Sequence, residues 1–161
     1  MSYTNADGLR VLTFGAQGTV ATSGQTVVSP EQVLVQKITL TALGTTFGAS
    51  NIDPYAPFIP AGSVITGATL VMTDAATSGG SATLTIGTYN AAGTAIDADG
   101  IDATVALTAI DADGDVVRCD GAQAAGVLGY CSANAYIGAI YATAAFTAGE
   151  AVLIVRYVKV A

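Results

Sequence analysis

Short apolar runs alternate with turns rich in Gly, Ala, Thr and Asp along the whole chain. No segment carries a sustained apolar stripe at the helical period of 3.6 residues, so the pattern predicts strands rather than helices. Eight runs of this kind lie at residues 9–14, 32–42, 63–73, 81–89, 103–109, 116–119, 135–143 and 151–160. Many short strands with Gly-rich turns predict an all-β fold, a β-sandwich or barrel. About eight strands fit a jelly-roll-like β-sandwich, although spacing alone does not separate it from an immunoglobulin-like one.

The second and third quarters of the chain contain the clearest predicted strand pair. Residues 63–73 and 81–89 are separated by a turn at 75–80, which favours a hairpin. Two-residue alternation predicts one buried face for the first of these strands, made by Val64, Thr66, Ala68, Leu70 and Met72. The long segment at residues 90–100 is predicted to be a loop.

The length of 161 residues favours one folded domain. Residues 1–8 are predicted to form a flexible N-terminal arm, and residues 9–161 a single β-sandwich domain. The segment at residues 44–62 is a long predicted loop that its three prolines, Pro54, Pro57 and Pro60, hold extended and stiff. It also carries Tyr55 and Phe58, and loops of this length in compact domains are often binding segments.

The composition combines many apolar residues with few charges. Hydrophobic residues make up 52% of the chain and charged residues 11%, where about 25% is usual. The excess of apolar surface favours burial in an oligomer or a larger assembly. The net charge of −7 with only five Lys and Arg excludes a basic patch of the kind that nucleic acids and anionic membranes require.

The sequence offers few of the residues that catalysis or metal binding requires. The chain has no His, so a Ser-His or Cys-His nucleophile is excluded, and we expect no enzymatic activity and no cofactor. Cys119 and Cys131 are compatible with two half-buried thiols or with a disulfide between adjacent strands. Asp111, Asp113 and Asp115 resemble the start of a calcium loop, but Gly114 and Ala122 break that pattern, so tight-turn chemistry is the leading interpretation and a calcium site the alternative.

Four segments resemble small virion proteins of tailed bacteriophages that decorate or cement the capsid. They are Ile59-Pro60-Ala61-Gly62 and residues 83–87, 97–100 and 151–158. Proteins of this group have an I/L-P-A-G-x-x-I/V-T strand opening, a T-L-x-I/V-G strand, a D-x-D-G-type loop and an apolar last strand. The resemblance implies a jelly-roll-like sandwich on the outer surface of the virion. It also implies homotrimers at three-fold positions that contact the major capsid protein.

The sequence thus yields a main hypothesis and an alternative. The main hypothesis is a structural protein that stabilises a phage capsid by protein–protein contacts, with neither nucleic acid nor membrane as a partner. Its predicted interface residues lie in the arm and in the Pro-rich loop: Met1, Ser2, Tyr3, Asp53, Pro54, Tyr55, Pro57, Phe58 and Pro60. The alternative is a β-domain of a phage tail or fibre that binds host-surface glycans.

Overall fold

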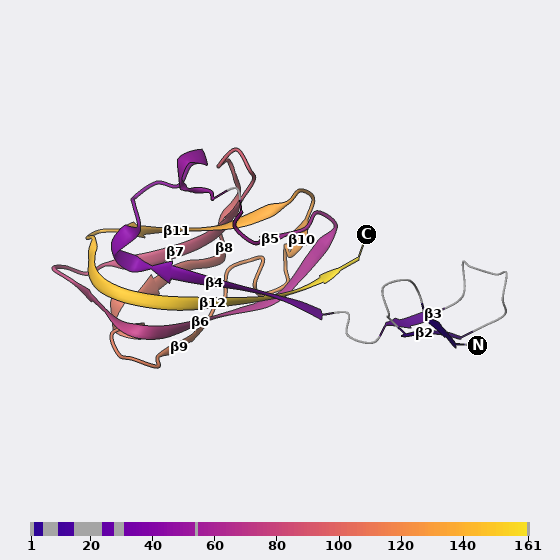
Figure 1. The fold of residues 1–161 in the computed structure, drawn as a ribbon. Helices are drawn as coiled ribbons and strands as arrows, with labels where there is room; N and C mark the ends of the chain where they lie inside the picture. The colour runs from indigo at the N-terminus through magenta and orange to yellow at the C-terminus, as the bar shows by residue number, and fades with distance from the viewer. Residues whose placement is uncertain (1, 5–9, 15–23, 28–30, 54, 161) are drawn as a thin grey trace. The chain divides into compact units, whose positions relative to one another are not determined.

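A computed structural model describes residues 2–4, 10–14, 24–27, 31–53 and 55–160, with side chains from residue 31 onward (Figure 1). Backbone contacts divide the chain into two compact units, Met1–Glu31 and Gln32–Ala161. Within the described residues there is no α-helix, and no helix is long and apolar enough to cross a membrane.

The first unit contains a three-stranded antiparallel sheet in the order β1-β2-β3. Its strands are β1 (Ser2–Thr4), β2 (Arg10–Phe14) and β3 (Gly24–Val27). The register places Tyr3 opposite Val11, and Val11 opposite Val27. The units divide after Glu31, whereas the arm was predicted to end at residue 8: β2 pairs with β1, and β3 pairs with the other edge of β2. Of the predicted arm, residues 1 and 5–8 lie outside the described residues.

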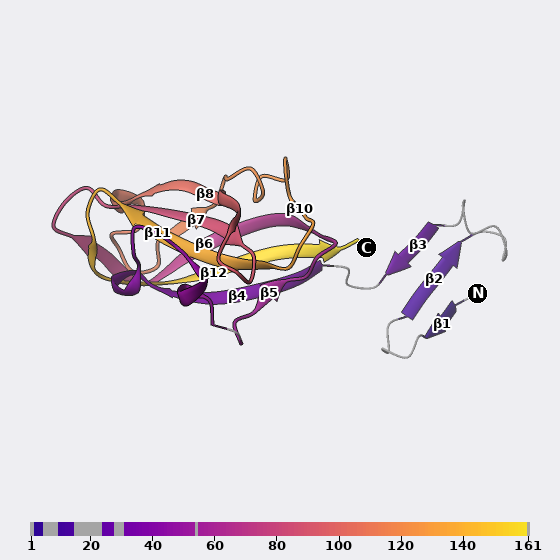
Figure 2. The same cartoon turned by 90° about the horizontal axis from the view of Figure 1, so that it is seen from above.

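The second unit is a sandwich of two sheets (Figures 1 and 2). Its nine strands are β4 (Glu31–Thr39), β5 (Phe58–Ile59), β6 (Ser63–Ser78), β7 (Thr83–Tyr89), β8 (Ala95–Ala106), β9 (Val116–Arg118), β10 (Tyr130–Cys131), β11 (Ala135–Ala142) and β12 (Phe146–Lys159). Three short 3₁₀ helices join them: η2 (Leu40–Ala42), η3 (Ala49–Asn51) and η4 (Leu107–Ala109).

The strand order confirms the predicted all-β sandwich, with nine strands in place of about eight. One sheet has the order β4-β12-β6, with β9 and β10 pairing with the far edge of β6; the other has the order β5-β11-β7-β8. Apart from the two-residue β10, this is the arrangement of a jelly roll, in which most successive strands lie in opposite sheets.

The predicted hairpin of residues 63–73 and 81–89 is wrong. Strand β6 belongs to the five-stranded sheet and pairs with β12, whereas β7 pairs with β11 and β8 in the other sheet. Strand β6 continues through the predicted turn to Ser78, and the chain crosses between the sheets at Gly79 and Gly80. A connection between sheets and a hairpin turn carry the same Gly and Ser residues, so the local sequence does not distinguish them.

The predicted buried face of β6 is correct for only part of its length. Ala68, Leu70 and Met72 are buried as predicted, but before them Ile65 is buried and Thr66 is exposed. The pairing with β12 shifts its register by one residue at this point, between the Gly67 and Ile65 positions. A bulge of this kind moves the following side chains to the opposite face of the sheet.

The core lies between the two sheets. Fully buried aliphatic side chains of both sheets meet there, among them Leu70 and Leu153 from one sheet and Leu84, Ile86 and Ile101 from the other. Burial of such side chains contributes about 1.5–3 kcal/mol each and stabilises the sandwich without cross-links.

Candidate interaction surfaces and the pocket between the sheets

The Pro-rich loop ends in an ordered turn that presents an aromatic ring. The Asp53 Oδ1 atom accepts the Tyr55 backbone N–H at 2.8 Å, and the Asp53 carbonyl accepts the Ala56 N–H at 2.9 Å. Tyr55 is 93% exposed, and Asp53 and Pro57 are exposed as well. Pro54 lies outside the described residues. The turn therefore holds a large ring in solvent, where it has the polar tip and apolar body of an interface tyrosine.

The base of the loop is fixed to the sandwich by β5. Ile59 is fully buried, and Phe58 and Ile59 pair with Tyr136 and Ala135 of β11. The rings of Phe58 and Tyr136 lie 5.4 Å apart between centroids, and Phe58 remains 40% exposed. Pro60 is half-buried as the chain turns into β6. The predicted interface residues Asp53, Tyr55, Pro57 and Phe58 thus lie together on a fixed loop.

The N-terminal interface prediction concerns residues whose side chains are not described. Ser2 and Tyr3 lie in β1, where they pair with Leu12 and Val11. Met1 lies outside the described residues. The role of these three residues stays a prediction.

The Asp111–Asp115 segment is a turn whose carboxylates are used by the backbone. Asp113 Oδ1 accepts the Ala75 N–H at 2.7 Å, and Asp115 Oδ2 accepts the Ala112 N–H at 2.9 Å. Within the part of the chain that the structure describes, no group of three or more acidic or Cys side chains is arranged to hold a metal ion. The two hydrogen bonds are those of an Asp-rich turn, and the calcium alternative stays a prediction.

A second acidic group is partly buried, which the sequence did not indicate. Burial raises the pKa of the Asp102 carboxyl, and the nearby Asp120 carboxylate raises it further, whereas the N–H groups of Thr104 and Asp120 lower it. Burial also raises the pKa of Asp97, and a hydrogen bond to the Asp99 carboxyl acts in the same direction. Two carboxyls that share a hydrogen bond hold a proton more tightly than an isolated Asp.

A buried amide lies beside this group. Gln123 is buried, and its Oε1 accepts the Thr88 hydroxyl at 2.8 Å. A Cβ at Gly100 would lie 2.5 Å from that same Oε1, so only glycine allows the close approach. We regard this network as structural, because its buried polar atoms satisfy one another.

The two cysteines are free and buried, so the disulfide alternative is wrong and both thiols are more deeply buried than expected. Burial, with added repulsion from the Asp102 and Asp120 carboxylates, raises the pKa of the Cys119 thiol to about 12. Burial also raises the pKa of Cys131. Thiols that stay protonated at neutral pH are poor nucleophiles, so both act as small core residues.

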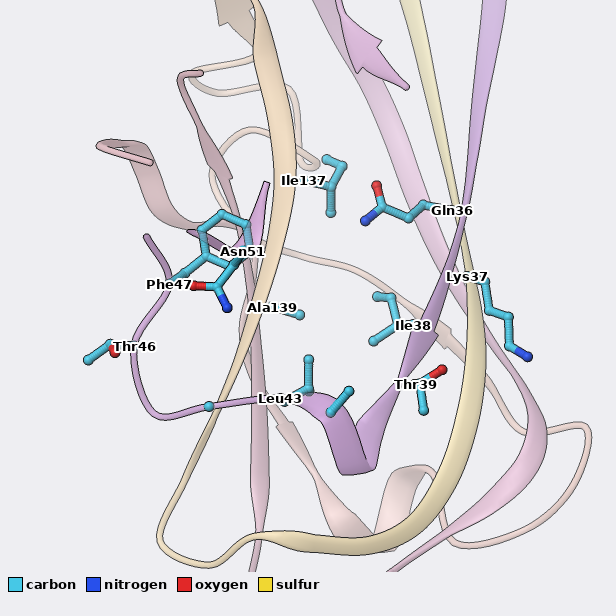
Figure 3. Close-up of a pocket in the computed structure, with 12 residues that line it drawn as sticks. Gln36, Lys37, Ile38, Thr39, Leu43, Thr46, Phe47, Asn51, Ile137 and Ala139 are labelled. Carbon is cyan, nitrogen blue, oxygen red and sulfur yellow. The ribbon is translucent and has the colours of Figure 1, made fainter. Parts of the chain in front are cut away.

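A pocket that the sequence did not predict opens between β4 and β11 (Figure 3). It has a volume of about 190 Å³, and the segment between η2 and η3 forms its third wall. Phe47 on that wall packs against Tyr89 at 4.4 Å between ring centroids. Gly138 allows this packing, since a Cβ there would lie 2.5 Å from the Tyr89 ring.

The pocket has a mixed lining. Apolar side chains come from Ile38, Leu43, Phe47 and Ile137, and polar ones from Gln36, Thr39, Thr46 and Asn51. The Gln36 amide points towards the space between the sheets in Figure 3, and its buried Oε1 has no hydrogen-bond partner. A buried acceptor of this kind favours a donor from water or from a ligand.

Comparison with known proteins gives a likeness of fold. The chain matches no protein-family model and no curated protein sequence. Among solved structures it is similar to a chain in the capsid of Ralstonia phage GP4, with a TM-score of 0.53 and 21% sequence identity. The match covers 81% of this chain and 85% of that chain. At this identity the likeness shows that the two share a β-sandwich fold.

Proposed function

We propose that this protein is a structural component of a tailed-phage virion that decorates or cements the outer surface of the capsid. It would act by binding the major capsid protein, as a homotrimer and without enzymatic activity. The observation that carries the proposal is the sandwich fold shared with a chain of a phage capsid over 81% of this chain. The four sequence segments that resemble phage decoration proteins support it independently.

The Pro-rich loop is the proposed contact element. Its base is anchored by the buried Ile59, while Tyr55 at its tip is almost fully exposed. A preorganised aromatic side chain loses little conformational entropy on binding, which favours affinity. Repeated at every symmetric position of a shell, contacts of modest strength add up to a large stabilisation.

The first experiment is a copy number per particle, measured by quantitative mass spectrometry of purified virions of the source phage. Hundreds of copies, commensurate with the symmetry of the shell, are the expected result. Detection of only a few copies per particle would instead assign the protein to the tail or a fibre. Absence from the virion would overturn both assignments.

The contact element is tested with variants added to particles that lack the protein. We expect Tyr55→Ala to reduce occupancy at least about tenfold, because interface tyrosines often contribute more than 1.4 kcal/mol. Val127→Ala, which changes another strongly exposed apolar residue, is the matched control and should bind normally. Deletion of residues 1–8 should also lower occupancy with the fold of the sandwich intact. Normal occupancy of the Tyr55→Ala variant would exclude the loop as the contact.

The pocket favours a second candidate function, a tail or fibre domain that binds host glycans. Its amide and hydroxyl groups beside the Phe47 ring are the donors, acceptors and apolar surface that sugars use. Binding of a glycan that is lost on Gln36→Ala, together with a low copy number, would favour this candidate over the first.

A further inference from the structure

The outer face of the five-stranded sheet is unusually apolar for a surface exposed to solvent. In β12 the buried residues include Leu153 and Val155, and the alternate positions Val152 and Ile154 point away from the core. An antiparallel sheet with one solvated face normally carries polar residues at such positions. Here both faces of β12 carry apolar residues.

The register joins these residues into one surface, called here the outer sheet face. Val71 of β6 is directly opposite both Val152 of β12 and Val116 of β9. Towards one end of the sheet, Val64 is likewise opposite both Tyr130 and Val158. Strands that pair in register place these side chains about 4.5–5.5 Å apart, so they form continuous apolar rows.

Strand β4 extends the outer sheet face to the edge of the sheet. Val33 and Val35 are 54% and 57% exposed, and Lys37 forms an ion pair of 2.7 Å with Glu150 of β12. Strands β4 and β12 run in opposite directions (Figure 1). The Lys37–Glu150 ion pair shows which parts of the two strands are neighbours, so Val35 and Val33 lie beside the part of β12 that contains Val152 and Ile154. Contiguous exposed apolar surface is typical of protein–protein contacts.

The outer sheet face carries two arginines beside the Lys37–Glu150 ion pair, in a chain whose net charge is −7. Arg118 and Arg156 are exposed on it, and among the described residues neither has a carboxylate at ion-pair distance. The Arg156 guanidinium lies over Gly67, 3.2 Å from the position of a Cβ there. The strands of this sheet hold four of the five Lys and Arg residues and three of the twelve acids.

The complementary charges border the outer sheet face, in the segments before and after β9, and continue onto β8 of the other sheet. Seven of the twelve acids fall between residues 97 and 120, on β8 and the segment that follows it, with Arg118 as the one cation in that stretch. We call the exposed members of this set the acidic edge: Asp99, Asp111, Asp113 and Asp120. Two outer sheet faces placed against each other would bring guanidinium groups together, which is unfavourable.

We infer that the outer sheet face binds the acidic edge of a second copy of this chain, in a head-to-tail contact. The apolar rows are then removed from water, and Arg118 and Arg156 gain carboxylates. A head-to-tail contact closes into a ring when its rotation allows closure. This inference does not depend on the virion role, because it concerns the isolated protein.

The inference is tested by analytical ultracentrifugation of the full chain over a range of concentrations. We expect the wild-type protein to self-associate, and 0.5 M salt to weaken the association because exposed charges are screened. The double variant Val35→Asp, Arg156→Glu changes the outer sheet face. The double variant Asp111→Lys, Asp120→Lys changes the acidic edge. Each should raise the dissociation constant at least about tenfold.

Mixing the two double variants distinguishes head-to-tail from face-to-face contact. Each variant keeps one intact surface, so an equimolar mixture should form heterodimers that do not grow further. Val127→Asp adds a charge at an exposed turn residue outside both surfaces and should associate like the wild type. Circular dichroism confirms that each variant is folded.

Three results would overturn the inference. They are a wild-type protein that stays monomeric at all concentrations, a sheet-face variant that associates like the wild type, and a mixture that forms no heterodimer. The virion role is judged separately by the copy number per particle, so either proposal can fail while the other stands.

Discussion

Replacement of Gly138 by Ala is expected to destabilise the sandwich and to distort one wall of the pocket. An added Cβ would lie 2.5 and 2.6 Å from two carbons of the Tyr89 ring and 2.9 Å from a carbon of the Phe47 ring. Ordinary contacts of this kind are about 3.5–4.0 Å long, so both rings must move by roughly 1 Å. Tyr89 is buried within β7, which pairs with β11 at this point, so its ring has little room to move.

The size of the effect follows from the crowding. Forcing extra atoms into a packed site costs about 1–3 kcal/mol, and here two rings are displaced at once, so we expect about 2 kcal/mol. For a unit of this size 1 kcal/mol changes the melting temperature by roughly 3–5 °C, which gives a decrease of roughly 6–10 °C. The tilted Phe47–Tyr89 pair, 4.4 Å between centroids, would be disrupted at the same time.

Thermal unfolding followed by circular dichroism measures the change, and tyrosine fluorescence reports the environment of Tyr89. Gly79→Ala is the matched control, because a Cβ there meets nothing within 4 Å. It should leave stability unchanged or raise it slightly. In a double-mutant cycle, adding Phe47→Ala should recover part of the stability that Gly138→Ala loses. An unchanged melting temperature for Gly138→Ala would refute the close packing of the two rings on β11.

Three further predictions concern the core and its ionisable groups. Ile59→Ala should cost about 2–4 kcal/mol in urea unfolding, because it leaves a cavity under the Pro-rich loop; a loss below 1 kcal/mol would contradict the anchoring role of β5. Native protein should show no reaction of Cys119 or Cys131 with a maleimide and two reactive thiols in urea, and a fast-reacting native thiol would contradict their burial. The pKa of Asp97 is raised, which means that the native state binds the Asp97 proton more tightly than the unfolded chain does. The protonated carboxyl therefore contributes its full stabilisation below the ordinary Asp pKa of about 4. This stabilisation is lost as the pH rises through the raised pKa of the native state. Asp97→Asn, whose amide can donate to Asp99 without a titrating proton, should remove this loss in unfolding measurements from pH 4 to 8, and an unchanged pH profile would refute the assignment.

The local chemistry of the chain was predictable from sequence where short-range forces decide it. Within the Asp111–Asp115 turn, the Asp115 carboxylate accepts the backbone N–H of Ala112, three residues before it, as is typical of Asp-rich turns. The burial of Ala68, Leu70 and Met72 was predictable as well, because these residues follow two-residue alternation.

Strand partners were not predictable in the same way. Residues 95–100 have the Asp and Gly content of a loop, yet they form the first half of β8. The pairing with β7 is irregular there: Thr88 is opposite Asp97, and Ile86 is opposite Asp102. Tertiary pairing with β7 outweighs the weak strand propensity of these residues. For the same reason, that local sequence does not determine strand partners, the hairpin of β6 and β7 was predicted wrongly and the pocket between β4 and β11 was not predicted.

The last strand illustrates what the sequence contains beyond the fold of one copy. A run such as AVLIVRYVKV, apolar at nearly every position, is typical of a strand that is buried on both faces. In the sandwich only one face of β12 meets the core, and Val152, Ile154 and Val158 remain on the other. The pattern therefore requires more burial than the single chain provides. Because Arg118 and Arg156 have no carboxylate at ion-pair distance among the described residues, we infer that the exposed acids of a second copy supply it and that the same contact covers the apolar rows.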